Sequence, residues 1–531
     1  MIQPVKALAL TAALTLSYGA QAEVPIPRLA PQPGVTHATL GGASHILAEE
    51  TLPLSTQIKK EATVDVSIAV SAFYKERDYA PIWTAQKAAA LRERLARAGD
   101  DGFDPAHYRV ADVGEGGLTE AAVEVSLTEA ALRYAHHATS GRTKPRSISS
   151  IMTIEPPTLD ERQFLNRLAA TNHVKALLDS LHPTHPAFVG LREALKAARG
   201  VGPDQRVAVP SGRNLRLGSK GPRVAALRSR LDETVPRGTD PTRFDKALDT
   251  AVRDFQRAQK VRADGIVGPQ TLRLLNDGLG EDDVAALISN MERWRWLPRN
   301  LGKHHVFVNI PAYRVRVVSS GSVTYDGRVI VGKPGNPTPI FSDEIEHLVV
   351  NPYWNVPYSI ASKEMLGGIQ ANPGGYFRRR GYEAVYRGRV VDPASLSWNR
   401  GMLRNVRIRQ RPGRRNALGA VKFMFPNKHA VYLHDTPTKH LFKRDRRAYS
   451  HGCVRVDQPF VFAEALLALD EGVSGSGIKR MVGGRQRHVN LEAHIPVHLT
   501  YFTRETKDDG TVKKYADVYG YDRRTQRALG L

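Results

Sequence analysis

The sequence contains a single cysteine, Cys453, among 531 residues. A lone cysteine has no partner within the chain, so a structural disulfide is excluded. The thiol can then be an inert buried side chain, a metal ligand or a nucleophile. The residues around Cys453 must decide among these three roles.

Long apolar runs are also absent. After the N-terminal segment, no apolar stretch approaches the ~20 residues of a membrane-spanning helix. The N-terminus carries Lys6, an apolar stretch over 7–18 and small residues up to Ala22. This order is typical of a secretory signal peptide. We therefore expect residues 1–22 to direct export, with membrane attachment only where the signal is retained.

Acidic residues are scarce, because 53 Asp and Glu stand against 76 Lys and Arg, for a net charge of +23. Such a charge attracts anionic partners over long range. The basic residues follow no groove-reading motif or aromatic stacking pattern, so nucleic acid is not expected as a partner. An anionic cell-wall polymer or a membrane surface suits an exported protein better, although a bias toward arginine codons would give the same charge.

The segments that are present differ in texture. Residues 23–60 are proline-rich without periodicity and are predicted to form a linker. Residues 61–200 show helical spacing of apolar side chains, interrupted at Gly141, which predicts an all-helical scaffold domain.

Residues 213–278 predict three short helices. The "FQ" pair at Phe255 and Gln256, followed by "DGIVGPQT" over 264–271, resembles the peptidoglycan-binding module of many wall hydrolases and transpeptidases. The resemblance implies that this segment contacts peptidoglycan.

From about residue 304 the pattern becomes mostly β, with alternating and β-branched runs bounded by Gly, Pro and Asn. This predicts a β domain over 304–502, interrupted by an arginine-rich insert at about 358–418. In the tail, 503–531, an Asp509-Gly510 turn separates two strand-like runs that are expected to complete the sheet.

A histidine that closes an apolar strand, His434 in "VYLHD", precedes Cys453 in "SHGCVR". This pair resembles the L,D-transpeptidase catalytic domain. "MERWRWLP", "GKPGNPTP", "NPYWNVP" and "RPGRRNALGAVKFMFPN" are similar to segments of the large Gram-negative members of that family. The resemblance implies a periplasmic enzyme without cofactor or metal. The fold expected is multidomain α+β: helical scaffold and binding module, then a mostly β catalytic domain with a capping insert.

The chemistry that this pair supports is nucleophilic catalysis. A free thiol is only a few per cent thiolate at neutral pH and needs activation to attack an amide. His434 can take the proton of Cys453 and later return it to the leaving amine. By resemblance, the main-chain carbonyl of Asp435, rather than its carboxylate, holds the imidazole.

Other candidate site residues flank the cysteine. The amides of Gly452 and Cys453 are expected to donate hydrogen bonds to the oxyanion, since glycine lets the reacting carbonyl approach closely. His451 is expected to line the same turn. Arg455 either binds a substrate carboxylate or fixes the loop, and the sequence leaves both open.

The insert has the composition of a cover. Its aromatic residues Tyr376, Phe377 and Trp398 and its basic run 378–380 are expected to close over an anionic peptide and exclude water. A surface insertion without such a role is the alternative.

Two other roles for the cysteine are weaker. A zinc site would draw on His434, His440, His451 and Cys453, but their spacing is irregular and unlike known zinc motifs. An inert thiol is disfavoured because histidine and glycine precede it and an idle thiol in an exported protein is open to oxidation.

The resemblance implies that Cys453 forms a thioester with the third residue of a peptidoglycan stem and expels D-alanine. A side-chain amine of a second stem then resolves it, and carbapenems acylate the same thiol. If water resolved the thioester, the enzyme would be an L,D-carboxypeptidase. If an amine of an outer-membrane protein resolved it, the enzyme would be an anchoring transpeptidase. In a different class, a non-catalytic wall-binding protein would explain the module and the charge, but not the His434/Cys453 pair.

Overall fold

The computed structural model describes residues 52–63, 66–200, 209–231, 240–259, 261–276, 281–469, 475–507 and 509–531. Within these ranges no helix is long and apolar enough to cross a membrane. The expected signal peptide and most of the expected linker lie outside the described residues. The last part of that linker is not irregular, because α1 already begins at Leu54.

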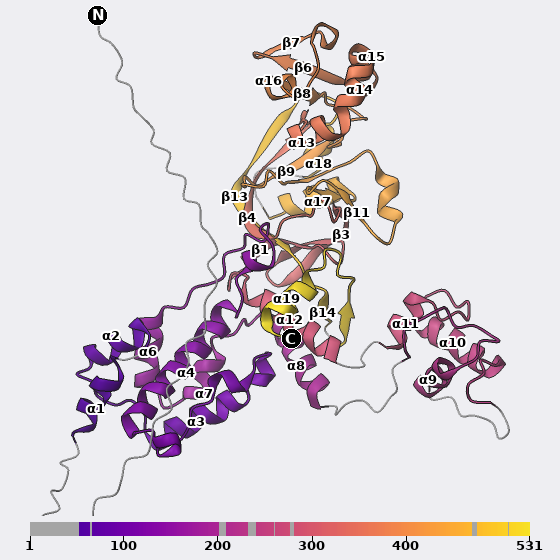
Figure 1. Ribbon diagram of the computed structural model, residues 1–531. Helices are drawn as coiled ribbons and strands as arrows, with labels where there is room; N and C mark the ends of the chain where they lie inside the picture. Colours follow the sequence, from indigo (N-terminus) through magenta and orange to yellow (C-terminus); the bar gives the residue numbers. More distant parts are fainter. Residues whose placement is uncertain are drawn as a thin grey trace, which may run out of the picture. The chain divides into compact units, whose positions relative to one another are not determined.

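A helical domain follows, drawn from indigo to violet in Figure 1. Its longest helix, α4, buries side chains on several faces, Tyr134 and Leu127 among them. Side-chain oxygens of Ser67, Thr84 and Thr119 cap three helix starts by accepting a backbone N–H, as such residues do at N-caps. The helices are α1 (Leu54–Glu61), α2 (Ile68–Glu76), α3 (Ala85–Ala96), α4 (Glu120–Ser140), α5 (Pro145–Ile148), α6 (Glu161–Ala170) and α7 (Val174–Asp179).

Two further helices, α8 (Pro186–Gly200) and α12 (Glu281–Arg295), do not share the core of that helical domain. Their buried side chains, such as Leu191 of α8 and Met291 of α12, belong to the apolar cluster of the β domain. The final helix of the expected scaffold segment 61–200 therefore packs with the core that supports the sheet.

The expected binding module consists of α9 (Pro222–Arg230), α10 (Lys246–Ala258) and α11 (Pro269–Leu275). Gln256, only 1% exposed, explains why the "FQ" and "DGIVGPQT" motifs occur together. Its amide nitrogen donates to Asp264, Ile266 and Thr271, and its oxygen accepts the N–H of Gly265. One buried glutamine thus holds the turn between two helices.

The β domain is built on a nine-stranded sheet in the order β11-β3-β12-β10-β9-β4-β13-β1-β2. Because β2 also pairs with β3, the chain of pairings closes on itself. Helix α17 (Pro459–Leu467) covers the apolar side, where Phe462 packs on Phe423 with ring centroids 4.7 Å apart. The strands are β1 (His304–Asn309), β2 (Arg314–Ser319), β3 (Ser322–Gly332), β4 (Phe341–Val350), β9 (Val421–Met424), β10 (Leu433–His434), β11 (Ala448–Ser450), β12 (Val454–Val456) and β13 (Arg487–Thr500).

The insert between β4 and β9 has its own four-stranded sheet, in the order β5-β8-β6-β7, and its own apolar core. Tyr376, Phe377 and Trp398 are buried in that core, at 9%, 2% and 6% exposure. The expectation that these rings cover a peptide is therefore wrong. The elements are β5 (Trp354–Asn355), α13 (Tyr358–Ile360), a π-helical turn (Ala361–Met365), α14 (Leu366–Ala371), α15 (Pro373–Arg380), β6 (Tyr382–Tyr386), β7 (Arg389–Val391), α16 (Met402–Asn405) and β8 (Val406–Gln410).

The C-terminal hairpin does not complete the main sheet as expected. Strands β14 (Arg504–Thr506) and β15 (Val512–Lys514) form a separate two-stranded sheet, followed by α19 (Tyr521–Leu529). The main sheet gains its C-terminal strand earlier, from β13, which pairs with both β4 and β1. Helical domains followed by a mostly β domain confirm the predicted multidomain α+β class.

Acidification is expected to destabilise the β domain through His498 of β13. This side chain is 3% exposed, its Nδ1 accepts from Ser342 Oγ at 2.8 Å, and its Nε2 donates to the Leu301 carbonyl at 2.9 Å. Burial and His305 lower the pKa of His498 to about 4. Below pH ~6.5 the imidazole is protonated in the unfolded chain but stays neutral in the folded protein. The free energy of unfolding therefore decreases as the pH falls toward 4, by up to ~3 kcal/mol.

Calorimetric melting of the unmodified protein and His498→Gln at pH 7.5 and 4.5 measures this effect. The gap in Tm between the two should shrink at pH 4.5, because only the unmodified protein loses the His498 contribution. His494→Gln, at a half-exposed position of the same strand, serves as the control. A gap that is the same at both pH values contradicts the assignment.

Candidate active site

Strand pairing brings His434 and Cys453 to one face of the sheet. Strand β10 runs parallel to β12, with His434 opposite Arg455 and Leu433 opposite Val454. Side chains alternate along a strand, so Cys453, two residues before Arg455, shares the face of His434. Leu433 and Val454 point to the other face, where both are fully buried in the apolar core.

His434 is 4% exposed and held by the neighbouring backbone. Its Nδ1 donates to the main-chain carbonyl of Asp435 at 2.5 Å. Burial, with the charge of Arg455 adding to it, lowers the pKa of His434 to about 3. The ring is therefore neutral at physiological pH, and the Nδ1–H tautomer leaves the Nε2 lone pair available to accept a proton.

The carboxylate of Asp435 has a different task from its carbonyl. It accepts the backbone N–H groups of Ala420 at 2.8 Å and Thr436 at 2.6 Å and pairs with Lys439 at 2.5 Å. A Cβ at Gly419, whose φ is +63°, would lie 2.2 Å from this carboxylate. The carboxylate fixes the loops on both sides of β10, so the carbonyl keeps its position under the imidazole.

The thiol of Cys453 is partly accessible, and its Sγ lies 3.9 Å from the carbonyl oxygen of Ala430. Among the described residues no hydrogen bond joins Sγ to His434. Burial raises the pKa of Cys453, while hydrogen bonds from Tyr432 and the charges of Arg455 and Lys422 act against this rise. Both shifts keep the pair as neutral thiol and neutral imidazole, and catalytic hydrogen bonds of this kind often tighten only with substrate bound.

The turn before the cysteine is held by side chains. Ser450 Oγ donates to the carbonyl of Cys453 at 2.5 Å and accepts the N–H of Gly452 at 3.2 Å. Thr338 Oγ1 donates to the carbonyl of Gly452 at 2.8 Å. Gly452 has φ +122°, a conformation that favours glycine. The N–H of Gly452 donates to Ser450 Oγ in this structure, and its expected role as an oxyanion donor stays a prediction.

His451 and Arg455 occupy different surroundings. His451 Nε2 donates to Glu364 Oε1 of the insert at 2.6 Å, and this hydrogen bond ties the turn to the insert. Arg455 shares the face of Cys453 and donates through one terminal nitrogen to Thr438 Oγ1 at 3.1 Å. Burial lowers the pKa of Arg455.

Sequence reasoning missed Tyr432, Lys422 and Glu364. Tyr432 stands two residues before His434, so strand alternation was a usable signal for it. Lys422 reaches this face because β9 pairs with β10 and places Lys422 opposite His434. Glu364 reaches the site because the insert contacts His451. Neither pairing leaves a local mark in the sequence.

The side chains considered for the zinc alternative do not form a ligand cluster. Across the described ranges, no group of three or more His, Cys, Asp or Glu side chains could hold a metal ion. His440 is exposed on a short 3-10 helix, Lys439–Lys443, while His434 is buried and bonded to Asp435.

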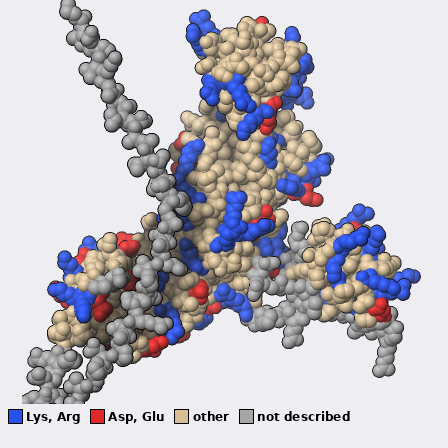
Figure 2. Space-filling view, viewed as in Figure 1, with Lys and Arg blue, Asp and Glu red and all other residues tan. Residues whose placement is uncertain are grey.

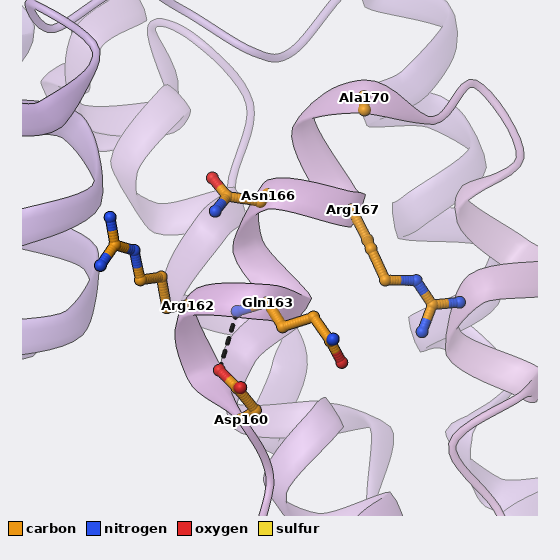
Figure 3. A pocket seen from close by; sticks show the side chains of 6 residues that line it. All are labelled: Asp160, Arg162, Gln163, Asn166, Arg167 and Ala170. Carbon is orange, nitrogen blue, oxygen red and sulfur yellow. Dashed lines mark hydrogen bonds between the residues drawn. The ribbon is translucent and has the colours of Figure 1, made fainter.

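A hollow of about 470 Å³ on the outside of α6 lies apart from this chemistry (Figure 3). Asp160 caps the helix by accepting the N–H of Gln163 at 2.9 Å. Arg162 and Arg167 extend in opposite directions, and Arg162 pairs with Glu76 at 3.2 Å. These exposed groups do not converge on a ligand.

Three segments of the chain match models of known domain families. Residues 303–470 match the L,D-transpeptidase catalytic domain, 220–275 the "Putative peptidoglycan binding domain" and 68–195 the "Scaffold domain". The chain therefore contains an L,D-transpeptidase catalytic domain and a peptidoglycan-binding domain. This confirms the resemblance predicted from the motifs around His434 and Cys453.

A curated protein of Haemophilus influenzae named "Putative L,D-transpeptidase" is 34% identical over 246 residues, 46% of this chain and 49% of that protein. The chain thus spans about half the length of the curated relative that it matches.

Two solved structures are also similar. An L,D-transpeptidase of Xylanimonas cellulosilytica is 16% identical, with 55% of this chain and 98% of that chain covered, at a TM-score of 0.15. An L,D-transpeptidase from Mycobacterium smegmatis is 13% identical, with 37% and 58% covered, at a TM-score of 0.19. Similarity at these TM-scores carries no functional conclusion.

The raised pKa of Cys453 predicts the pH dependence of its alkylation in the free enzyme. Labelling by iodoacetamide should be slow at pH 7 and should still rise above pH 9, because only the thiolate reacts. Tyr432→Phe removes a hydrogen bond that favours the thiolate, so the midpoint should move further up. Tyr449→Phe, at an exposed position in the preceding strand, should leave the midpoint unchanged. A midpoint below pH 8 in the unmodified enzyme would contradict this assignment.

Proposed function

We propose that this chain, with its L,D-transpeptidase catalytic domain, crosslinks peptidoglycan stem peptides through a thioester on Cys453. The observation that carries the proposal is the parallel pairing of β10 with β12, which puts His434 and Cys453 on one face. The hydrogen bond from His434 Nδ1 to the Asp435 carbonyl supports the base role, because it leaves Nε2 for the proton.

In the first step, Cys453 Sγ attacks the carbonyl carbon of the third residue of a tetrapeptide stem. His434 Nε2 takes the thiol proton as the carbon–sulfur bond forms. The tetrahedral intermediate then expels D-alanine as the carbon–nitrogen bond breaks, and the imidazolium gives its proton to the leaving amine. The product is an acyl thioester on Cys453.

The low pKa of His434 favours return of the proton to the leaving amine but opposes its uptake from the thiol, so the cycle also depends on neighbouring groups that stabilise negative charge at the sulfur. Stabilisation of the oxyanion falls to the amide of Cys453 in this mechanism, since the amide of Gly452 is bonded to Ser450. Arg455 and Lys422 lower the cost of negative charge at the sulfur.

In the second step, the side-chain amine of the third residue in another stem attacks the thioester. His434 takes the proton from the attacking amine and returns it to the departing sulfur, which restores the free thiol. The new amide joins two third-position residues. The reaction needs no group beyond those of the two stems and the enzyme.

The remaining domains fit a wall enzyme. The peptidoglycan-binding domain at 220–275 would keep the catalytic domain close to a polymeric substrate. The N-terminal signal would deliver the protein to the periplasm, where that polymer lies. The positive charge of +23 favours association with the anionic wall.

Mass analysis of muropeptides tests the proposal. Incubation of the purified enzyme with tetrapeptide-containing wall fragments should release D-alanine and give dimers joined through two third residues. Cys453→Ala should abolish the product while keeping the melting temperature, and His434→Ala should slow it by ~10² or more, the scale for losing a positioned base. His440→Ala, at the exposed histidine, should keep nearly full activity.

Other products would identify other acceptors. Tripeptide monomers alone would mean that water resolves the thioester, and stem attachment to an outer-membrane protein would mean an anchoring transpeptidase. Retained crosslinking in Cys453→Ala would overturn the mechanism, and inactivity of the folded unmodified enzyme on all substrates would favour a wall-binding protein.

Carbapenems are expected to form a stable adduct on Cys453, because their strained ring presents an acyl centre that the thiol can open. Intact-protein mass spectrometry should show the mass of one drug molecule added to the unmodified protein and none on Cys453→Ala. Most penicillins should react poorly. Equal labelling of Cys453→Ala would show that the adduct forms elsewhere.

A further inference from the structure

A pocket of about 340 Å³ lies between the insert and the loop that follows His434. Its volume falls within the range of ~300 to 1,000 Å³ that small-molecule sites occupy. Four arginines line it: Arg379 and Arg380 at the end of α15, Arg415 after β8, and Arg455 on β12. The other polar residues of the lining are Tyr382, Gln410, Thr436 and Thr438, and no carboxylate lines the pocket.

The four guanidinium groups lack ion-pair partners among the described residues. Nearby carboxylates are already used: Glu383 binds Arg409 and Arg411, each at 2.6 Å, and Asp435 binds Lys439. In Figure 2 blue side chains outnumber red ones on the visible surface of the insert. Four like charges around one hollow repel each other, so a bound anion would lower the energy of the site.

Arg455 is the lining residue that comes from β12, the strand that directly follows the nucleophile. Its Nε is buried and has no hydrogen-bond partner in the described part of the chain, while a terminal nitrogen donates to Thr438. A buried donor left unpaired costs ~1 to 3 kcal/mol. Other groups of the pocket are already positioned: Arg415 donates to the Arg379 carbonyl at 2.9 Å, and Arg380 lies over the ring of Tyr376 at 4.1 Å.

The pocket adjoins the nucleophile. Cys453 and Arg455 are two residues apart on one strand face, a spacing of about 6 to 7 Å. A group bound at Arg455 therefore lies within about one or two residues of a peptide carbonyl that Cys453 attacks. Guanidinium groups bind carboxylates in bidentate fashion, and four of them can bind more than one carboxylate.

We propose that this four-arginine pocket binds the free carboxylates of the stem peptide that flank the reacting carbonyl. The inference rests on the proposed function, since it takes the ligand to be a peptidoglycan stem. The insert then contributes to substrate binding through its basic edge, Arg379 and Arg380, while its aromatic residues form its own core. Arg455 is the member that couples this pocket to the catalytic face.

Calorimetric titration of the full chain carrying Cys453→Ala with the free tetrapeptide L-Ala-γ-D-Glu-diaminopimelate-D-Ala tests the pocket without turnover. Adding Arg379→Ala and Arg415→Ala together should weaken binding by about tenfold or more, the scale of a charge-assisted hydrogen bond. The Kd of a variant with Arg379→Lys and Arg415→Lys should lie between the Kd of the Cys453→Ala protein and the Kd of the double alanine variant. Arg389→Ala, at an exposed position on β7 of the insert that does not line the pocket, should change the Kd by less than twofold.

A tetrapeptide whose carboxylates are converted to carboxamides should bind the Cys453→Ala protein (the parent) weakly. Its Kd should be about that of the unmodified tetrapeptide for the variant that also carries Arg379→Ala and Arg415→Ala (the double variant). It should also bind the parent and the double variant equally. Unchanged binding by the double variant, or no binding of the free peptide at millimolar concentration, would overturn the proposal. Inorganic phosphate that binds with the same affinity and arginine dependence would instead make the pocket a general anion site.

The two proposals fail separately in these measurements. Arginine-dependent binding of the peptide together with inactivity of the unmodified enzyme would remove the transpeptidase mechanism and leave the carboxylate pocket. Normal crosslinking together with arginine-independent binding would remove the pocket and leave the mechanism. Melting temperatures of all variants within a few degrees of the parent establish that the comparison is between folded proteins.

Discussion

The parallel pairing of β10 with β12 is the constraint on which the site depends. Leu433 and Val454 face each other in this pairing and are fully buried, so the register is fixed by apolar packing. A slip of one residue would turn that apolar pair to the polar face and bury His434 and Arg455 in the core. The hydrophobic core therefore determines which polar side chains meet beside Cys453.

Burial on this face then sets the electrostatics. It lowers the pKa of His434 and raises that of Cys453, so the resting pair is uncharged. Arg455 acts on both groups, against protonation of the histidine and in favour of the thiolate. The same residue lines the arginine pocket, so one side chain links nucleophile, base and the proposed site for substrate carboxylates.

Sequence patterns anticipated the features that depend on short stretches of chain. The α+β class followed from helical and strand periodicity, and the resemblance to a peptidoglycan-binding module followed from the order of the "FQ" and "DGIVGPQT" motifs. Features that depend on packing between distant segments were missed or misread. Phe377 and Trp398 looked like a cover, but a subdomain of this size needs its own core and buries them. The hydrogen bond from the Gly452 amide to the Ser450 hydroxyl depends on a rotamer that no sequence pattern specifies, and Lys422 reaches the site only through strand pairing.

The central claim, a covalent acyl intermediate on Cys453, is tested most directly by acid-quenched mass spectrometry. The enzyme is mixed with stem tetrapeptide whose diaminopimelate side-chain amine is acetylated, so that no acceptor amine is present. The reaction is stopped within seconds, and the protein is digested. The peptide containing Cys453 should carry the mass of one acyl tripeptide in a form that hydroxylamine removes, and this species should disappear when an acceptor stem is added. Turnover of tetrapeptide without any acyl mass on that cysteine would contradict the account.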